Sequence, residues 1–185
     1  MRQFAETLIG PIRETVLECA GNGDRADLSS LTDPEALFSA FVESARRWRG
    51  DRRLEVHAVR IPWEFQVTGL WLERECSDAV IVERHTDPIH RSQILGHELW
   101  HIHQGDGFTA EQLAVGSCQF LGPESAPDVQ TAAARSRFDK DPEREAETFG
   151  ILVGQQLRSL MEWDVITGET ARNIAAALNY QGRRR

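Results

Sequence analysis

The sequence predicts an α+β domain in which helices pack with a small, mainly antiparallel sheet. Two observations carry this prediction. Apolar residues recur every three or four positions up to residue 50 and again after residue 87, which is typical of amphipathic helices. Between these parts, short runs alternate apolar with polar residues, as half-buried strands do. No internal repeat is present, so we interpret residues 1–50 as a helical segment of the same domain, whose core comprises residues 51–185.

Two helices are expected before the sheet. The first covers residues 2–19 and contains Pro11, a residue type that kinks or restarts helices. The sequence Gly-Asn-Gly-Asp at residues 21–24 then marks a break. The second helix covers residues 34–49, with Asp33 as its N-cap and a proline at its first position.

Three short strands are expected in the middle of the chain, over residues 54–59, 70–73 and 78–82. Each is rich in apolar or β-branched residues, and the last is almost continuously apolar. Pro62 and the polar residues 73–77 separate them. This part of the sequence therefore predicts the sheet.

Helices are expected again after the sheet. An Asp-Pro start at residue 87 opens a helix that extends through His103 and ends before Gly105. Residues 108–139 are expected to contain one or two short helices. A further Asp-Pro start predicts a helix over residues 141–157, and a last helix is expected over residues 170–178.

Charge and cysteine content narrow the classes of function. The net charge is −8, so tight binding of nucleic acid across the surface is not expected. The arginines at positions 46–53 and 183–185 are interpreted as solvated faces. Three widely spaced cysteines form no disulfide framework, and no apolar stretch reaches the 18 residues typical of a membrane span. We therefore expect a cytoplasmic protein with reduced thiols and no membrane association.

The most informative feature is the sequence His-Glu-Leu-Trp-His at residues 97–101, an H-E-x-x-H motif. On a helix, residues four apart lie on one face, so the imidazoles of His97 and His101 can bind one cation. Zinc accepts such nitrogen ligands, and a catalytic zinc site keeps one position for water. Glu98 lies one residue along and can take a proton from that water without binding the metal. The motif thus predicts Zn²⁺, with Glu98 as the general base.

The sequence around the motif agrees with this interpretation. The expected helix starts ten residues before the first histidine, and Gly96 permits another element to approach closely. The apolar neighbours of the motif can bury the helix; they are Ile94, Leu95, Leu99 and Ile102.

A catalytic zinc needs a third protein ligand, and a second downstream histidine does not supply it. Gly107 stands where the extended motif has that histidine, and His103 lies about 240° around the helix from His97. A carboxylate from the helix at residues 141–157 is the remaining candidate. Glu143 and Glu147 share one face of that helix, so one can bind the metal while the other supports a histidine. A surface helix with acidic residues near its start would show the same pattern.

Residues 91–101, Arg-Ser-Gln-Ile-Leu-Gly-His-Glu-Leu-Trp-His, together with residues 143–150, Glu-Arg-Glu-Ala-Glu-Thr-Phe-Gly, resemble the ImmA/IrrE family of bacterial metallopeptidases. That family has an H-E-L-x-H helix followed by a helix reading roughly E-x-E-A-x-x-F-A. The resemblance implies a zincin-like, gluzincin-like metallopeptidase fold, with Glu143 as the third zinc ligand and Glu145 as the fallback. The segment between the motifs is long, and Glu147 and Gly150 depart from the family pattern.

The resemblance also implies a function. Members of this family typically cleave a helix-turn-helix repressor or an antitoxin-like partner and so derepress genes. A zinc endopeptidase of this kind needs a protein substrate and no direct contact with nucleic acid. We expect the substrate to pair with an edge strand, for which residues 80–82 are the nearest candidate. His90, His103 and Tyr180 are candidates for a second donor to the oxyanion.

Other interpretations remain open from the sequence. The protein could be a non-catalytic zinc-containing regulator or toxin component that binds a partner, or a hydrolase of a small amide. A structural zinc site normally has four protein ligands and needs no base such as Glu98, which argues against the first. DNA binding by the N-terminal helices lacks a helix-turn-helix signature. Manganese or iron can occupy the same set of ligands as zinc.

Overall fold

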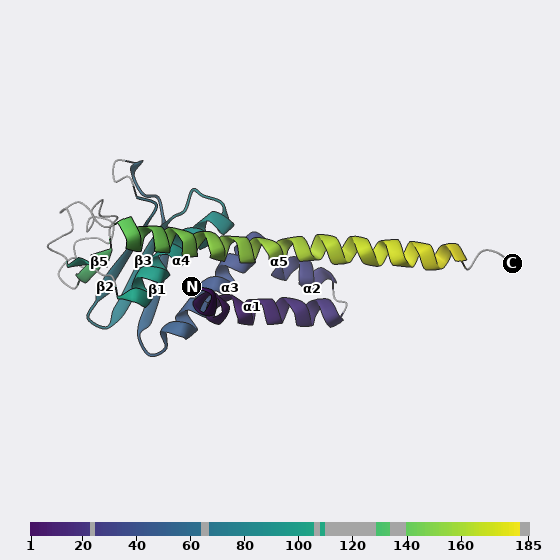
Figure 1. Ribbon diagram of the computed structural model, residues 1–185, viewed down its shortest axis with the longest axis horizontal. Coiled ribbons are helices and arrows are strands. Elements are labelled where there is room, and N and C mark those ends of the chain that lie inside the picture. Colours follow the sequence, from purple (N-terminus) through teal and green to yellow (C-terminus); the bar gives the residue numbers. More distant parts are fainter. Residues whose placement is uncertain (23–24, 64–66, 106–107, 110–128, 134–139, 182–185) are drawn as a thin grey trace.

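The computed structural model describes residues 1–22, 25–63, 67–105, 108–109, 129–133 and 140–181, and it describes the side chains of the last helix as far as Glu162. Helices precede and follow a sheet, which confirms the predicted α+β class (Figure 1). The helices are α1 (Arg2–Asn22), α2 (Arg25–Leu31), α3 (Pro34–Arg49), α4 (Pro88–Gln104) and α5 (Lys140–Gln181). The strands are β1 (Arg53–Val59), β2 (Gly69–Arg74), β3 (Ser77–Glu83), β4 (Phe108–Thr109) and β5 (Val129–Ala133).

The sheet has the order β1-β3-β2-β5-β4, in which β1 and β3 are parallel and the other neighbours are antiparallel. The prediction of a mainly antiparallel sheet is confirmed, and so are its three expected strands. Strands β4 and β5 were not predicted, because helices were expected in residues 108–139; residues 110–128 and 134–139 lie outside the described part.

One prediction about the sheet is wrong. Residues 80–82 belong to β3, which pairs with β1 on one side and β2 on the other. Both rows of backbone hydrogen-bonding groups of β3 are therefore used within the sheet, and β3 cannot accept a substrate strand. The cause is the parallel pairing of β1 with β3, a long-range contact that strand periodicity does not reveal.

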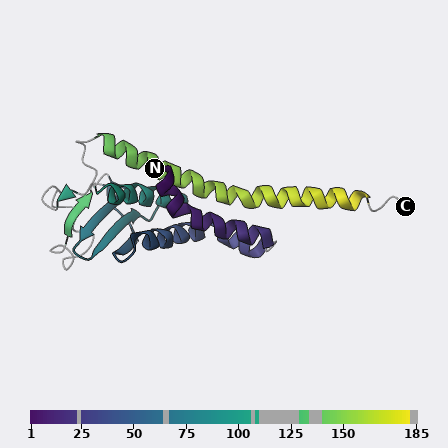
Figure 2. The same cartoon turned by 60° about the horizontal axis from the view of Figure 1, so that its bottom comes forward.

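One continuous core joins the N-terminal helices to the H-E-x-x-H helix. The aromatic ring of Phe4 in α1 stacks on Phe149 of α5, with centroids 5.0 Å apart, and lies 6.1 Å from Trp100 of α4. Val80 and Val82 of β3 face the same core, whereas Ala79 and Ile81 face a smaller cluster on the other side of the sheet. Figures 1 and 2 show α5 running along the outside of α4, so that α4 lies between α5 and the sheet.

The predicted start signals of two helices are confirmed. The Asp33 carboxylate accepts hydrogen bonds from the backbone N–H groups of Glu35 and Ala36 at the start of α3. Asp87 does the same for Ile89 and His90 at the start of α4. Helix α4 ends as predicted, at Gly105, which has a left-handed conformation with φ of 74°.

The last helix differs from the prediction in two ways. It begins at Lys140, so Asp141 lies in its first turn instead of capping it. The two helices expected over residues 141–157 and 170–178 form one helix of 42 residues, whose second half extends beyond the other helices (Figures 1 and 2). A single glycine, Gly168, lies between the two predicted segments, and one glycine costs a helix only about 1 kcal/mol relative to alanine.

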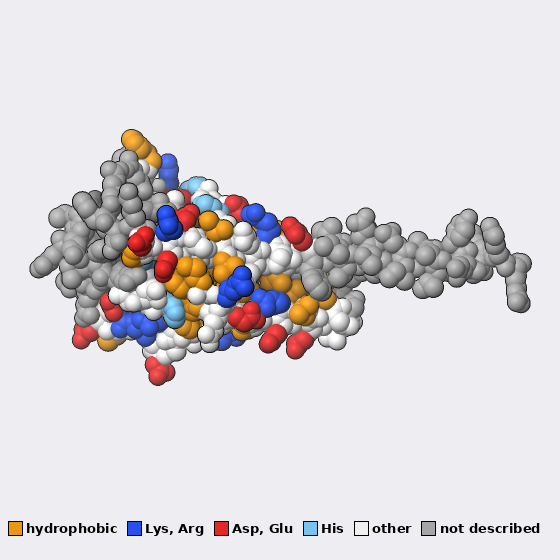
Figure 3. All heavy atoms as spheres, in the orientation of Figure 1, with side chains coloured by type: hydrophobic (Ala, Val, Ile, Leu, Met, Phe, Trp, Pro, Cys, Tyr) orange, Lys and Arg blue, Asp and Glu red, His pale blue; other side chains and the backbone are white. Residues whose placement is uncertain are grey.

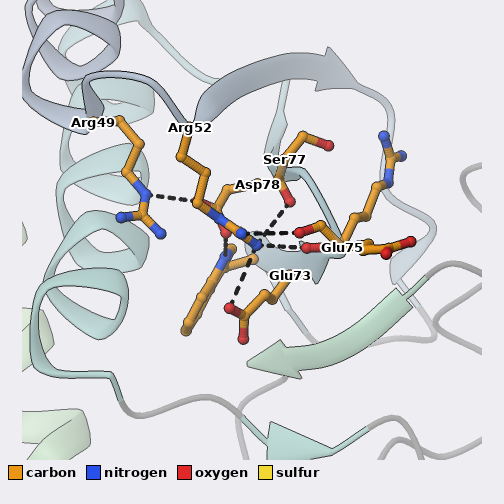
Figure 4. Close-up of polar contacts among 8 residues, drawn as sticks. Arg49, Arg52, Glu73, Glu75, Ser77 and Asp78 are labelled. Atoms are coloured by element: carbon orange, nitrogen blue, oxygen red, sulfur yellow. Dashed lines mark hydrogen bonds and ion pairs between the residues drawn. The ribbon is translucent and has the colours of Figure 1, made fainter.

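Two of the arginines interpreted as solvated belong instead to a buried cluster (Figure 4). The Asp78 carboxylate of β3 is fully buried and accepts hydrogen bonds from Arg49 Nε at 2.6 Å and Arg52 Nε at 3.0 Å. Trp71 Nε1 donates to its other oxygen at 3.1 Å. Arg52 also donates to carbonyl oxygens of the turn between β2 and β3. The cluster, which we call the Asp78 cluster (Arg49, Arg52, Trp71 and Asp78), ties the end of α3 to the sheet.

No helix in the part of the chain that the structure describes is apolar over a length that would cross a bilayer. Figure 3 shows that charged side chains of both signs are distributed over the visible face of the body.

Candidate metal centre

The two histidines of the motif point into one buried site. They lie one helical turn apart on α4, and only 7% of His97 and 3% of His101 is exposed. Their Nε2 atoms are 3.1 Å apart, and the two rings meet nearly edge to face. The helix thus brings two nitrogen ligands to one point, as the spacing of the motif predicts.

Glu143 of α5 faces this pair of nitrogen atoms. Its Oε2 atom lies 3.6 Å from His97 Nε2, and its Oε1 atom lies 3.6 Å from His101 Nε2. One ligand atom from each of the three residues can be chosen so that all lie within 4.8 Å of one another. The structure therefore brings together the three residues that the sequence and the family resemblance nominate as metal ligands.

The distances fit a zinc ion. A tetrahedral zinc with bonds of roughly 2.0–2.2 Å holds its ligand atoms about 3.3–3.6 Å apart. The separation of 3.1 Å joins the two imidazole nitrogens, and the two separations of 3.6 Å join each nitrogen to a different oxygen of Glu143; all three lie close to that range. Two of them exceed the length of an ordinary hydrogen bond. Three protein ligands also leave a fourth position for water, as catalytic zinc sites do.

Small residues at the contact between α4 and α5 allow Glu143 to reach the histidines. A Cβ atom on Gly150 would lie 2.5 Å from the carbonyl oxygen of Gln93, and one on Gly96 would lie 3.3 Å from Gly150 Cα. The backbones of the two helices are therefore too close for any side chain at Gly150. This explains the departure of Gly150 from the alanine of the family pattern.

Glu98, the predicted general base, lies beside the histidines and is only 4% exposed. It lines a cavity of about 180 Å³ that opens next to the metal centre. The cavity has walls from α4, α5 and the residue before β2; its lining residues are Thr68, His90, Gln93, Ile94, His97, Glu98, Glu147, Gly150 and Ile151. A carboxylate, the candidate metal centre and a cavity thus adjoin one another. Thr68 was not predicted from the sequence, because no local motif or spacing indicates that the residue before β2 lies beside the H-E-x-x-H helix.

The other two glutamates in the first two turns of α5 have different positions. The Glu147 carboxylate is 3.9 Å from His97 Nδ1, too far for a direct hydrogen bond but near enough to interact with the ring. Glu147 is the residue expected to support a histidine if Glu143 binds the metal. Glu145, the fallback ligand, is exposed and lies about 200° around the helix from Glu143. Among the described residues, it does not belong to the group of potential ligands.

The three candidates for a second oxyanion donor differ in their position relative to the site. His90 lines the cavity with His97 and Glu98. His103 faces away and stacks on Phe4, with ring centroids 4.1 Å apart. Burial, and then the positive charge of the N-terminal amine, lowers the pKa of His103, which favours its neutral form. The side chain of Tyr180 lies outside the described part of the chain.

Comparison of the chain with models of protein families, with curated proteins and with solved structures finds no match. The inference of function therefore depends on the site itself.

Proposed function

We propose that this protein is a zinc-dependent endopeptidase with a zincin-like fold, similar to the ImmA/IrrE family. The observation that carries the proposal is the convergence of His97, His101 and Glu143, whose ligand atoms lie within 4.8 Å of one another, beside the buried Glu98. Chance does not favour such a group, because an H-E-x-x-H motif and a carboxylate 42 residues later must meet across two packed helices.

The residues of the chain have distinct roles in this chemistry. Zinc, when bound, polarises the carbonyl group of a substrate and lowers the pKa of a water ligand to about 7. Glu98 accepts a proton from the attacking water, whose oxygen forms a bond to the carbonyl carbon. Glu98 then donates that proton to the amide nitrogen as the carbon–nitrogen bond breaks. The cavity beside Glu98 holds a side chain of the substrate next to the bond that is cleaved.

For the substrate, we propose a helix-turn-helix repressor or an antitoxin-like protein, which the family resemblance implies. Proteins of this kind present basic surfaces for DNA, and the net charge of −8 on this chain favours their approach. Cleavage would separate parts of the repressor and release the genes that it controls.

The test begins with the metal content of the purified protein, measured by elemental mass spectrometry. We expect about one zinc per chain in the wild type and a marked loss in Glu143→Ala, since a catalytic site has three protein ligands. Glu145→Ala is the matched control: it removes a neighbouring carboxylate that does not face the histidines, and it should keep the zinc.

Activity is then measured on a quenched-fluorescence peptide library and on purified candidate repressors. Cleavage by the wild type that is lost on chelation supports the proposal. A folded protein that binds no zinc after reconstitution contradicts it. A protein that binds zinc and a repressor but cleaves neither substrate would instead be a non-catalytic regulator.

A further inference from the structure

We propose that Gly69, the first residue of β2, is a positioning residue for the general base Glu98. Its missing side chain leaves the space that the Glu98 carboxylate occupies. The inference rests on the proposed function, because it concerns the residue that moves the proton. It extends that function to β2, none of whose described residues belongs to the group of potential metal ligands.

The backbone of Gly69 does not itself require glycine. Among the described glycines, Gly50 and Gly105 are those with a positive φ, and Gly69 is not one of them. Gly69 is paired with Val82 of β3 in regular antiparallel register. Glycine weakens a strand because it gains no side-chain packing and loses more backbone entropy on folding. Its presence at this position therefore needs a reason other than conformation.

That reason is the close approach of α4. A Cβ atom on Gly69 would lie 2.7 Å from Glu98 Oε1 and 3.3 Å from Glu98 Cγ. It would also lie 2.5 Å from Ile94 Cγ2, one helical turn before Glu98. Two side chains on the inner face of α4 therefore occupy the volume in which any other residue would place its Cβ atom.

The two neighbours respond differently to a methyl group. Ile94 is branched at Cβ and 6% exposed, so it moves only with its helix. The Glu98 carboxylate lies at the end of a flexible side chain, so it can move without its helix. A methyl group at Gly69 is therefore expected to displace the proton acceptor, in addition to straining the contact with Ile94. Displacement by about 1 Å is enough to reduce turnover about 100-fold.

The glycines between α4 and α5 have a different role. The Cβ atoms missing from Gly96, Gly150 and Gly154 would meet atoms of the facing helix, and none of these contacts involves Glu98. They set the distance between the helices and hence the position of the metal ligands. The nearest atoms to a Cβ on Gly69 belong instead to Ile94 and Glu98, and neither histidine is among them, so its substitution should leave the metal in place.

The test is a double-mutant cycle with four proteins: the wild type, Gly69→Ala, Glu98→Asp, and the double variant. The aspartate carboxylate is shorter by one methylene, so it withdraws from the position that the new methyl group needs. We expect Gly69→Ala to lower kcat about 100-fold, with KM changed less than about twofold and zinc retained. In the Glu98→Asp background, the same substitution should change kcat less than about threefold. An equal loss in both backgrounds would show a merely structural role and overturn the inference.

Two further variants keep the experiment decisive if Gly69→Ala folds poorly. Ile94→Ala removes the other obstructing methyl group, so Gly69→Ala/Ile94→Ala compared with Ile94→Ala isolates the contact with Glu98. Gly21→Ala makes the same chemical change where no atom lies within 4 Å, and it should leave kcat unchanged. A fully active Gly69→Ala/Ile94→Ala variant, relative to Ile94→Ala, also overturns the inference.

A binding measurement separates this inference from the proposed function. The probe is leucine hydroxamate, which binds the metal and donates a hydrogen bond to the base. On the zinc-loaded proteins, Gly69→Ala should weaken its binding about tenfold, the loss of one charge-assisted hydrogen bond. In the Glu98→Asp background, where the shorter carboxylate leaves room for the methyl group, adding Gly69→Ala should not weaken binding further. Unchanged affinity in Gly69→Ala overturns the inference. Full activity of Glu98→Gln would instead remove the proposed base, while this titration still reports the contact between Gly69 and Glu98.

Discussion

The candidate metal centre and the Asp78 cluster both bury carboxylates among nitrogen-bearing side chains, but the atoms meet at different distances. In the Asp78 cluster, Arg49, Arg52 and Trp71 donate to the carboxylate at 2.6, 3.0 and 3.1 Å (Figure 4). In the metal centre, both oxygens of Glu143 are 3.6 Å from a histidine nitrogen. The first set of distances is that of direct hydrogen bonds. The second set exceeds hydrogen-bond length and is close to the separation of ligand atoms around a tetrahedral zinc, although the two histidine nitrogens themselves are 3.1 Å apart.

This difference separates a cluster whose charges are paired within the chain from a group of residues that could hold a metal ion. The fully buried Asp78 has donors for both of its oxygens within the chain, so its charge is compensated in the folded protein. The candidate metal centre adjoins a cavity of about 180 Å³. We therefore expect substitutions in the metal centre to change activity or zinc binding, and substitutions in the Asp78 cluster to change stability.

The largest effect is expected for Glu98→Gln. The amide keeps the shape of the side chain but cannot accept the proton, so activity should fall about 10²- to 10⁴-fold. Zinc content and thermal stability should remain those of the wild type. Measurements of kcat/KM and of zinc content test whether activity falls while the metal is kept. Full activity in the variant would contradict the role of Glu98 as general base.

Asp78→Asn should have the next largest effect, on stability. Removing the charge leaves Arg49 and Arg52 without their buried partner, which costs about 3–5 kcal/mol of unfolding free energy. Urea denaturation measures the loss. Arg53→Ala is the control, because Arg53 is 77% exposed and its ion pair with Glu55 contributes at most about 1 kcal/mol. Equal losses in the two variants would remove the distinction between buried and exposed pairs.

Zinc should stabilise the protein through the metal centre alone. At a free zinc concentration 100 times the Kd, the unfolding free energy should rise by about 2.7 kcal/mol. His101→Ala should abolish this increase, whereas Asp78→Asn should retain it. Denaturation curves with and without zinc provide the measurement, and an undiminished increase in His101→Ala would place the ion elsewhere.

The smallest effect is expected at Glu83, a carboxylate that accepts hydrogen bonds at the protein surface. Burial raises its pKa, but the backbone N–H groups of His85 and Ile61, at 2.8 and 2.6 Å, outweigh burial and lower the pKa below 4.5. The folded state thus favours the charged form of Glu83. The resulting stabilisation is present at pH values above the ordinary pKa of a glutamate, and it is lost as the pH falls through the lowered pKa of the folded state. At pH 7, the unfolding free energy of the wild type, measured by urea denaturation, should be about 1 kcal/mol larger than that of Glu83→Gln. A difference that does not shrink in acid would contradict this account.

Much of the fold was predictable because its signals are local. Asp33 and Asp87 cap their helices through hydrogen bonds to residues two and three positions away, so neighbouring residues suffice to predict the starts of α3 and α4. Strand β5 lacks such signals, since it pairs with β2 across more than 50 residues of chain. The central position of β3 was missed for the same reason.

The sequence by itself determined that His97, Glu98 and His101 share a helix with two imidazoles on one face, because 3.6 residues per turn fixes that geometry. It also limited the candidates for a third metal ligand to the carboxylates of α5. Only the tertiary structure decided that Glu143 and not Glu145 faces the histidines, and that Gly69 lies against Glu98. The tertiary structure also decided that Arg49 and Arg52 form ion pairs with the buried Asp78. These contacts join residues far apart in the chain, and they depend on how closely helices and strands pack, which periodicity does not encode.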